Sequence, residues 1–208
     1  MVKFRSLLCI GAAILAVIGL FGSCENFWMK NLLNVKDEGG DGTAGNPFWV
    51  YNEVTLWHVG NPDSGSYSEW TLNAHYIQTQ DIFLTGPFQA IGDNSAKFTG
   101  SFNGNGKTIS NLNISSMNDN QGLFGYIDSS AVIKNVRLES CSISGKSNTG
   151  SIVGANYGQV QNCSASGSVS STSLSTCTGG VVGNNYNQVQ NCHSTCTVSG
   201  VTYAGGVV

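Results

Sequence analysis

Residues 151–163 read SIVGANYGQVQNC, and residues 180–192 read GVVGNNYNQVQNC, so the second stretch repeats the first 29 positions later. An earlier copy opens with GLFG at Gly122, at the same spacing of 29, and a fourth opens with GVV at Gly206. Periods of 20 to 50 residues are typical of solenoids, in which each unit buries its apolar face only by stacking on its neighbours. The repeat therefore predicts a solenoid.

The residues that follow a recurring asparagine predict what lies inside this solenoid. Asn135, Asn162 and Asn191 mark the same point of the first three copies, and the first copy has two extra residues before it. Every second residue after the asparagine is small or apolar, as expected for strands that stack on the next coil roughly 4.8 Å away. These inward positions are Val136, Leu138, Ile143, Cys163, Ala165, Val169, Cys192, Ser194 and Val198. We expect intervening residues such as Arg137, Ser164 and His193 to face water, and no helix after residue 98. The fold class is thus all-β, a parallel β-helix.

The segment GNGKT, Gly104 to Thr108, is close to the end of a phosphate-binding loop. That motif requires a glycine at position 101, which is Ser101, and a helix after the lysine, whereas Ile109 and the residues after it alternate as a strand. We therefore expect a tight turn in which both glycines hold positive φ, with Lys107 in solvent, and no nucleotide cofactor.

The first 23 residues have the organisation of an export signal. Lys3 and Arg5 precede an uncharged apolar stretch, Ser6 to Phe21, which is short for a membrane span. Two small residues then precede Cys24, a pattern that resembles a bacterial lipobox, in which the cysteine is lipidated and becomes the mature N-terminus. The alternative is an ordinary cleaved signal peptide followed by an incidental cysteine. Both alternatives place the mature chain outside the cytoplasm.

Four segments follow from these features. Residues 1–23 are a lipoprotein signal peptide, and residues 24–41 form a tether that begins with an apolar patch. Residues 42–97 form an N-terminal capping region, and residues 98–208 form the β-helix. The last copy stops at Val208, before its closing glycine, so we expect a truncated C-terminus that self-associates through an open last coil.

The motifs GLFG, SIVG and GVVG, each followed by Asn-Val or Asn-Cys, resemble GLUG repeats, which occur in bacterial surface adhesins and in the N-terminal region of IgA-specific metallopeptidases. The preceding stretch, Phe98 to Ile114, is similar to the segment that leads into the first such repeat. The resemblance covers roughly residues 42–208. It implies a right-handed β-helix and no catalytic residue, because the repeats carry none in that family.

Side chains able to carry chemistry are few. Charged residues make up 10% of the chain, and none occurs from Ser147 to Val208. The net charge of −3 offers no basic surface for nucleic acid. The three histidines, His58, His75 and His193, are not followed by Glu, so the zinc-peptidase motif H-E-x-x-H does not occur. The acids are scattered through expected turns, where Asp usually binds the backbone. They are Asp81, Asp93, Asp119, Asp128 and Glu139. We therefore expect no catalytic site, no metal and no cofactor.

The cysteines beyond Cys24 are odd in number, which prevents complete internal pairing. They are Cys141, Cys163, Cys177, Cys192 and Cys196. The repeat places Cys163 and Cys192 on adjacent coils, both facing inward. Parallel neighbours hold their Cβ atoms roughly 4.8 Å apart, whereas a disulfide prefers about 3.8 Å. We expect these two residues to act as small hydrophobes in the core.

Two functions remain open from the sequence. The first is a lipid-anchored surface protein that acts as a non-catalytic adhesin or scaffold and binds a glycan or protein through uncharged Ser, Thr and Asn side chains. The second is the β-helical stalk of a larger secreted hydrolase whose catalytic domain lies elsewhere. Further repeats encoded after Val208 would favour the first, and a domain with H-E-x-x-H would favour the second.

Overall fold

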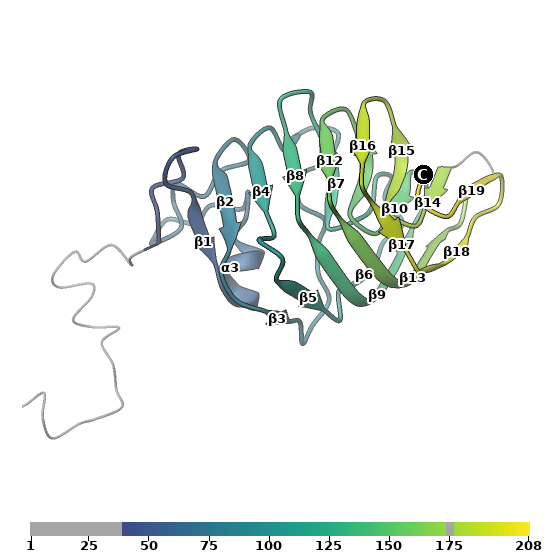
Figure 1. Cartoon of the computed structure of the whole chain (residues 1–208), viewed down its shortest axis with the longest axis horizontal. Helices are drawn as coiled ribbons and strands as arrows, with labels where there is room; N and C mark the ends of the chain where they lie inside the picture. Colours follow the sequence, from purple (N-terminus) through teal and green to yellow (C-terminus); the bar gives the residue numbers. More distant parts are fainter. Residues whose placement is uncertain (1–38, 174–176) are drawn as a thin grey trace, which may run out of the picture. The chain divides into compact units, whose positions relative to one another are not determined.

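The computed structural model describes residues 39–173 and 177–208, and residues 40–208 form one compact unit. Within it the chain winds into a parallel β-solenoid whose coils stack side by side (Figure 1). Every ladder between named strands is parallel. The predicted all-β parallel β-helix is confirmed. The signal peptide, Cys24 and the tether up to residue 38 lie outside the described residues.

Four sheets form the faces of the solenoid. The first sheet contains β1 (Phe48–Val50), β2 (His75–Gln78), β4 (Ser101–Asn103), β8 (Val132–Lys134), β12 (Gln159–Gln161) and β16 (Gln188–Gln190). The second contains β3 (Ile82–Phe83), β5 (Thr108–Ser110), β6 (Asn113–Ser115), β9 (Arg137–Gly145), β13 (Ser164–Ser171), β17 (His193–Ser194) and β18 (Thr197–Ser199). The third contains β10 (Thr149–Gly150), β14 (Cys177–Gly179) and β19 (Tyr203–Gly205). The fourth contains β7 (Phe124–Ile127), β11 (Val153–Asn156) and β15 (Val182–Asn185).

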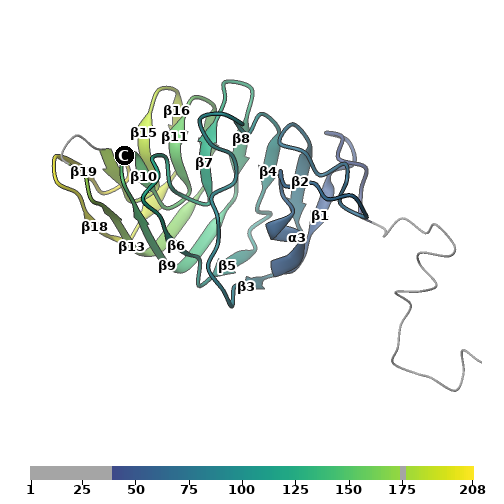
Figure 2. The same cartoon turned by 180° about the vertical axis from the view of Figure 1, so that it is seen from behind.

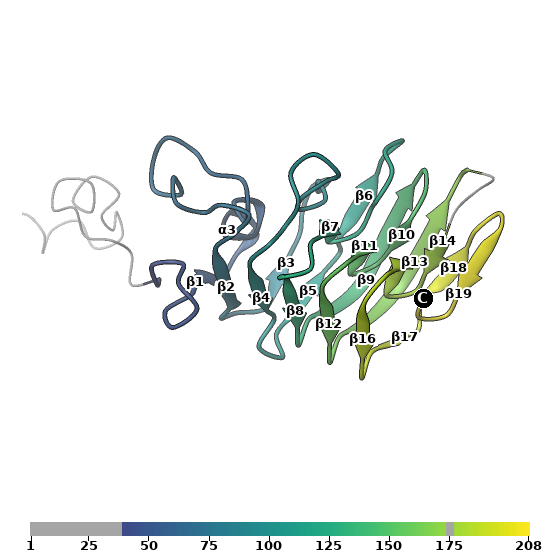
Figure 3. The same cartoon turned by 90° about the horizontal axis from the view of Figure 1, so that it is seen from above.

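One coil runs through the four sheets in turn, from β8 through β9 and β10 to β11, and the next coil begins at β12. Figure 2 shows β7 and β11 from behind, and Figure 3 shows the coils from above. Val153 pairs with Phe124 on one side and with Val182 on the other, so the 29-residue repeat of the sequence is the register of the fold. The two extra residues of the first copy lie in the turn between β7 and β8, which is longer than its counterpart between β11 and β12.

The recurring asparagine is a corner residue. Asn135, Asn162 and Asn191 have φ of 55°, 53° and 54°, a left-handed conformation that asparagine tolerates better than most residues. Their side chains also bond from coil to coil. Asn135 donates to the side-chain oxygen of Asn103 at 2.9 Å, Asn162 donates to Asn135 at 3.3 Å, and Asn191 donates to Asn162 at 3.2 Å. This asparagine ladder turns the chain from the first sheet into the second.

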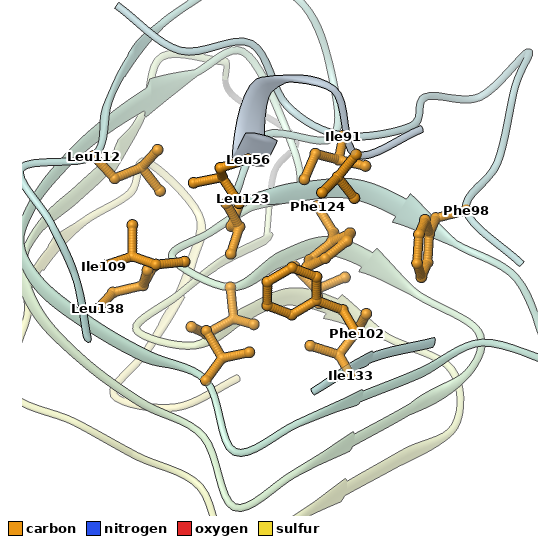
Figure 4. Close-up of a cluster of buried hydrophobic side chains, with 14 of the residues drawn as sticks. Leu56, Ile91, Phe98, Phe102, Ile109, Leu112, Leu123, Phe124, Ile133 and Leu138 are labelled. Carbon is orange, nitrogen blue, oxygen red and sulfur yellow. The ribbon is translucent and has the colours of Figure 1, made fainter. Parts of the chain in front are cut away.

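The core fills the space that the four sheets enclose (Figure 4). The N-terminal coils fill it with large residues: Phe98, Phe102 and Phe124 are fully buried, and the Phe124 ring centroid lies 4.9 Å from that of Phe98 and 5.5 Å from that of Phe102. Later coils use smaller residues. The predicted inward residues Val136, Leu138, Ile143, Cys163, Ala165 and Val169 are buried, whereas Cys192, Ser194 and Val198 in the last coil are half-buried. The predicted alternation is therefore confirmed.

The region before residue 98 joins the same architecture. β1 and β2 belong to the first sheet and β3 to the second, so the solenoid begins before Phe98. The helix α3 (Glu53–Trp57) is the only helix among residues 39–173 and 177–208. It starts in a capping box, in which the Asn52 side chain accepts from the backbone of Thr55 at 2.8 Å and the Thr55 hydroxyl faces back toward Asn52.

The GNGKT segment forms the turn that the sequence predicts, and β5 rather than a helix follows it. The Lys107 N–H donates to the carbonyl of Gly104, and φ is 53° at Asn105 and 69° at Gly106. The expectation of a positive φ is wrong for Gly104, which is not in the left-handed region. A Cβ on Gly104 would lie 2.4 Å from the carbonyl oxygen of Asn135, so this glycine is required by the close approach of the next coil.

Candidate functional site

A small pocket opens beside the first coils, between the end of α3 and the segment that leads into Phe98. Its volume is about 210 Å³. Its lining residues are Trp57, Val59, Gly60, Asn61, Leu72, Gln89, Ala90, Ile91, Gly92, Asp93 and Ala96. Among them, Val59 and Ile91 are buried and apolar, whereas Trp57, Asn61, Gln89 and Asp93 are exposed. The pocket thus combines an apolar base with an aromatic residue and a few polar residues, as ligand sites do.

Trp57 owes its place to the residues around α3. It is the last residue of the helix and 49% of it is exposed. Next to it, the ring of His58 stacks on Tyr67 with 3.9 Å between centroids and meets the Trp57 ring edge-on at 5.1 Å. At the other end of the helix, the Glu53 carboxylate accepts from the backbone N–H of Thr85 at 2.9 Å, a bond that lowers the Glu53 pKa. These contacts fix the helix against the solenoid.

Asp93 is held by a turn on the opposite wall. One of its carboxylate oxygens accepts from the backbone N–H groups of Ser95 at 2.7 Å and Ala96 at 2.8 Å. Gly92, just before it, has φ of 71°, and a Cβ there would lie 2.9 Å from the backbone nitrogen of Phe98. The turn is therefore short and tied to the sheet, which makes the position of Asp93 a property of the fold rather than of a loose loop.

A stack of tyrosines runs along the solenoid beyond this turn. Tyr126 and Tyr157 lie 5.1 Å apart with an interplanar angle of 8°, and Tyr157 and Tyr186 lie 4.4 Å apart at 17°. Lys97 places its Nζ 4.8 Å from the centre of the Tyr126 ring and 3.7 Å from the Asp128 carboxylate. The ring faces are thus turned toward one another, so the stack stabilises adjacent coils more readily than it offers a flat platform to a ligand.

The outer face of the first sheet carries one column of side chains that crosses all six strands in register. The column consists of Trp49, Ile77, Asn103, Lys134, Gln161 and Gln190. In its last two coils the side chains are the neutral amides of Gln161 and Gln190, and Gln161 donates to Gln159 of its own strand at 3.0 Å. We call the four glutamines of these two coils, Gln159, Gln161, Gln188 and Gln190, the amide face.

The second sheet presents two further columns of polar side chains, which we call the hydroxyl columns because all members except Asn113 carry a hydroxyl group. The first contains Asn113, Ser142, Ser168 and Thr197, and the second contains Ser115, Ser144, Ser170 and Ser199. They alternate with the buried residues Ile114, Ile143 and Val169. Like the amide face, these columns carry no charge, and they repeat one side chain per coil.

The sequence-predicted chemical groups are not brought together. His75 contacts the Ser101 hydroxyl at 2.8 Å, His58 stacks on Tyr67, and His193 is exposed on β17. Asp81, Asp93, Asp119 and Asp128 lie outside the strands, as predicted, whereas the expectation of a turn is wrong for Glu139, which lies in β9. Asp81 accepts from the backbone of Thr108, Asp128 from that of Ser129, Asp119 from the Ser147 hydroxyl, and Glu139 pairs with Arg137. Among the described residues, no group of three or more His, Cys, Asp or Glu side chains could hold a metal ion.

The cysteines form two inward pairs. Cys163 is buried and Cys192 packs against the core on the next coil, as predicted. The contact with Cys192, together with burial, raises the pKa of the Cys163 thiol, and the same contact lowers the pKa of Cys192 to about 6. Cys141 and Cys196 also face each other, with their sulfurs 3.9 Å apart. All five described cysteines are free thiols.

Cys24, the predicted lipidation site, lies outside the described residues. Within the described part of the chain, no helix is long and apolar enough to cross a bilayer. The Trp57 pocket is the feature that the sequence did not predict. The stretch Trp-His-Val-Gly-Asn, residues 57–61, lies between two solenoid strands and was its only signal, and its partner Asp93 lies 36 positions after Trp57 in the sequence.

Known proteins resemble this chain in three ways. Residues 145–170 match the family profile described as the GLUG motif. Halomucin of Haloquadratum walsbyi is 35% identical over 136 residues, which is 62% of this chain and 2% of halomucin. A protein of Evansella cellulosilytica, named as a Gly-rich membrane protein, is 34% identical over 137 residues, which is 61% of this chain and 15% of that protein. The chain thus spans a small part of the length of both relatives.

Among solved structures, a chain from Bacteroides ovatus described as an immunoglobulin A1 protease aligns with a TM-score of 0.36 and 16% identity, over 79% of this chain and 77% of that chain. The profile match overlaps β9 to β13, from Gly145 at the end of β9 into β13, and so spans one coil of the repeat. It confirms the resemblance that the GLFG, SIVG and GVVG motifs indicate. The chain therefore carries a match to the GLUG motif at residues 145–170, within a parallel β-solenoid.

Proposed function

We propose that this chain is a non-catalytic binding scaffold of the cell envelope, anchored by a lipid on Cys24, that acts as an adhesin toward a glycan or protein ligand. The observation that carries the proposal is the pair of uncharged outer surfaces, the amide face and the hydroxyl columns, on which each coil repeats similar side chains. Such a surface offers many weak hydrogen bonds to an extended ligand, and these add when several coils engage it together.

Two further observations support this function. Asp81 and Asp128 accept hydrogen bonds from backbone N–H groups and Glu139 pairs with Arg137, so these three acids are not arranged together as a general acid and base. The resemblance to a protein named as a membrane protein is in keeping with an envelope location. A rigid solenoid with a lipid at one end would project its outer faces away from the membrane.

The anchor can be tested by cell fractionation of the full-length chain in a bacterial host. Cys24→Ala should move the protein from the membrane fraction to the soluble fraction. Cys9→Ala, a change of the same kind inside the signal segment, should leave it in the membrane fraction. Continued membrane association of Cys24→Ala would show that lipidation at Cys24 is not the anchor.

The binding role can be tested with cells that display the full-length chain. We expect these cells to adhere to at least one surface coated with glycans or with extracellular matrix proteins, and the bound material to be recovered unaltered. Cleavage of that material by the chain, or adhesion to none of the surfaces, would contradict the proposed function.

A further inference from the structure

We propose that the pocket beside Trp57 is a binding site for one sugar ring of a neutral glycan. The inference rests on the proposed binding function and assigns it a place and a ligand class. The pocket holds about 210 Å³, below the roughly 300 to 1,000 Å³ of sites for drug-sized ligands, so its occupant is about the size of a single ring.

The surface chemistry of the pocket matches a pyranose. One face of such a ring is a patch of C–H groups, and the electron-rich face of an indole attracts these weakly positive hydrogens. Trp57 offers an indole that is 49% exposed, beside the apolar residues Val59 and Ile91. The rim of a pyranose consists of hydroxyl groups, which both donate and accept. Asn61, Gln89 and Asp93 supply amide and carboxylate groups at the pocket wall.

The carboxylate of Asp93 is arranged as a ligand group. The N–H groups of Ser95 and Ala96 bind one of its oxygens, which fixes the orientation of the side chain. A carboxylate with a fixed orientation accepts hydrogen bonds from neighbouring hydroxyls on one sugar at low entropic cost, and these charge-assisted bonds are stronger than neutral ones.

The charges around the pocket select a neutral ligand. Asp93 is the only ionisable residue in the lining, and its negative charge repels sulfate, phosphate and carboxylate groups. The nearby cation Lys97 lies 3.7 Å from the Asp128 carboxylate and over the Tyr126 ring, so its charge is already balanced. Sialylated and sulfated glycans should therefore bind less well than neutral ones.

The test uses the full-length chain on an array of neutral, sialylated and sulfated oligosaccharides, followed by titration with methyl glycosides of the common hexoses, read by isothermal titration calorimetry so that removal of a tryptophan does not remove the signal. We expect neutral glycans to bind. Trp57→Ala should weaken this binding by about tenfold or more, because it removes both the stacking on the indole and the apolar area that the indole buries, and together these contribute more free energy than a tenfold change in Kd. Trp49→Ala is the matched control, because Trp49 is 41% exposed on β1 and does not line the pocket. It should change binding less than about twofold.

Asp93→Asn provides a second variant that keeps the oxygen to which Ser95 and Ala96 donate. It should fold normally, as judged by its melting temperature, and should weaken the binding of neutral glycans by several-fold. It should also reduce the discrimination against sulfated glycans, a change that a purely structural role for Asp93 would not produce.

The outcomes separate the site from the function. Equal glycan binding by Trp57→Ala and Trp49→Ala would overturn the site. If glycan binding were then lost when Gln159 and Gln161 are changed to Ala, the proposed scaffold function would still stand, with the ligand on the amide face. A preference for sulfated or sialylated glycans would also overturn the site. Binding to protein ligands alone would refute the site and retain the function, whereas binding to neither class would refute both.

Discussion

Asn162 donates its side-chain amide to the side-chain oxygen of Asn135, one coil earlier, at 3.3 Å, and both residues hold the same left-handed backbone conformation. Asparagine therefore performs two tasks at this corner. It tolerates φ near 53°, which costs most other residues about 1 kcal/mol or more, and it links the coils by hydrogen bonds. Substitutions can separate the two tasks.

Asn162→Gly should destabilise the protein by about 1 kcal/mol, because it removes the ladder bonds to Asn135 and Asn191 but keeps the backbone conformation. Asn162→Ala should cost about 2 kcal/mol, because it removes the same bonds and also strains the corner. Urea unfolding of both variants gives the comparison. Equal losses for Gly and Ala would show that the left-handed conformation carries no energetic weight here.

The contribution of the tyrosine stack to stability can also be tested by two substitutions at one residue. Tyr157→Ala removes the ring that lies between Tyr126 and Tyr186, and we expect a loss of about 1 to 2 kcal/mol from burial and stacking. Tyr157→Phe keeps the ring and should lie within about 0.5 kcal/mol of the unchanged protein. Thermal unfolding of the two variants distinguishes ring stacking from a role of the phenol hydroxyl, which would make Phe as harmful as Ala.

The fold could be predicted from the sequence because its repeat carries the same information several times. The spacing between Ser151 and Gly180 sets the register, and the alternation after Asn135 separates core from surface. The requirement for Gly104 could not be predicted in this way. A glycine needed for positive φ and a glycine needed for close approach look alike in sequence, and only the position of the next coil tells them apart.

The candidate site was less accessible to prediction. The sequence indicates where titratable groups are scarce, and the structure places Asp81 and Asp128 in backbone contacts as expected. The pocket, however, joins Trp57 and Asp93 from segments outside the repeat, where no periodicity fixes their relative position. Such a site depends on how the chain between Trp57 and Phe98 packs against the first coils.

Thiol labelling can test the inward register of the cysteines. Cys163 is buried and its pKa is raised by the contact with Cys192, so it should react slowly with iodoacetamide at pH 7. Cys192 is half-buried with a pKa lowered to about 6, so a larger fraction of it is thiolate at pH 7 and it should react faster. Its rate should fall as the pH drops below about 6. Mass spectrometry of peptides assigns the sites. Rapid reaction of both thiols would place them on the outside of the solenoid and refute the register.

Gly154, the glycine that ends the SIVG motif, offers the sharpest test of the close packing between coils. A Cβ on Gly154 would lie 2.5 Å from the carbonyl carbon of Asn120 and 2.6 Å from the backbone nitrogen of Gln121. Backbone atoms cannot move aside as a flexible side chain can, so Gly154→Ala should cost roughly 4 kcal/mol or more, or prevent folding. Gly86→Ala is the control, because nothing lies within 4 Å of its Cβ and its φ is not in the left-handed region. It should change stability by less than about 1 kcal/mol, with stabilisation expected from the stiffer unfolded chain. Urea unfolding measures both, and yield of soluble protein serves if Gly154→Ala does not fold. A Gly154→Ala protein as stable as Gly86→Ala would mean that the coils do not approach each other as closely as described, and that close approach is not the reason for a glycine at position 154.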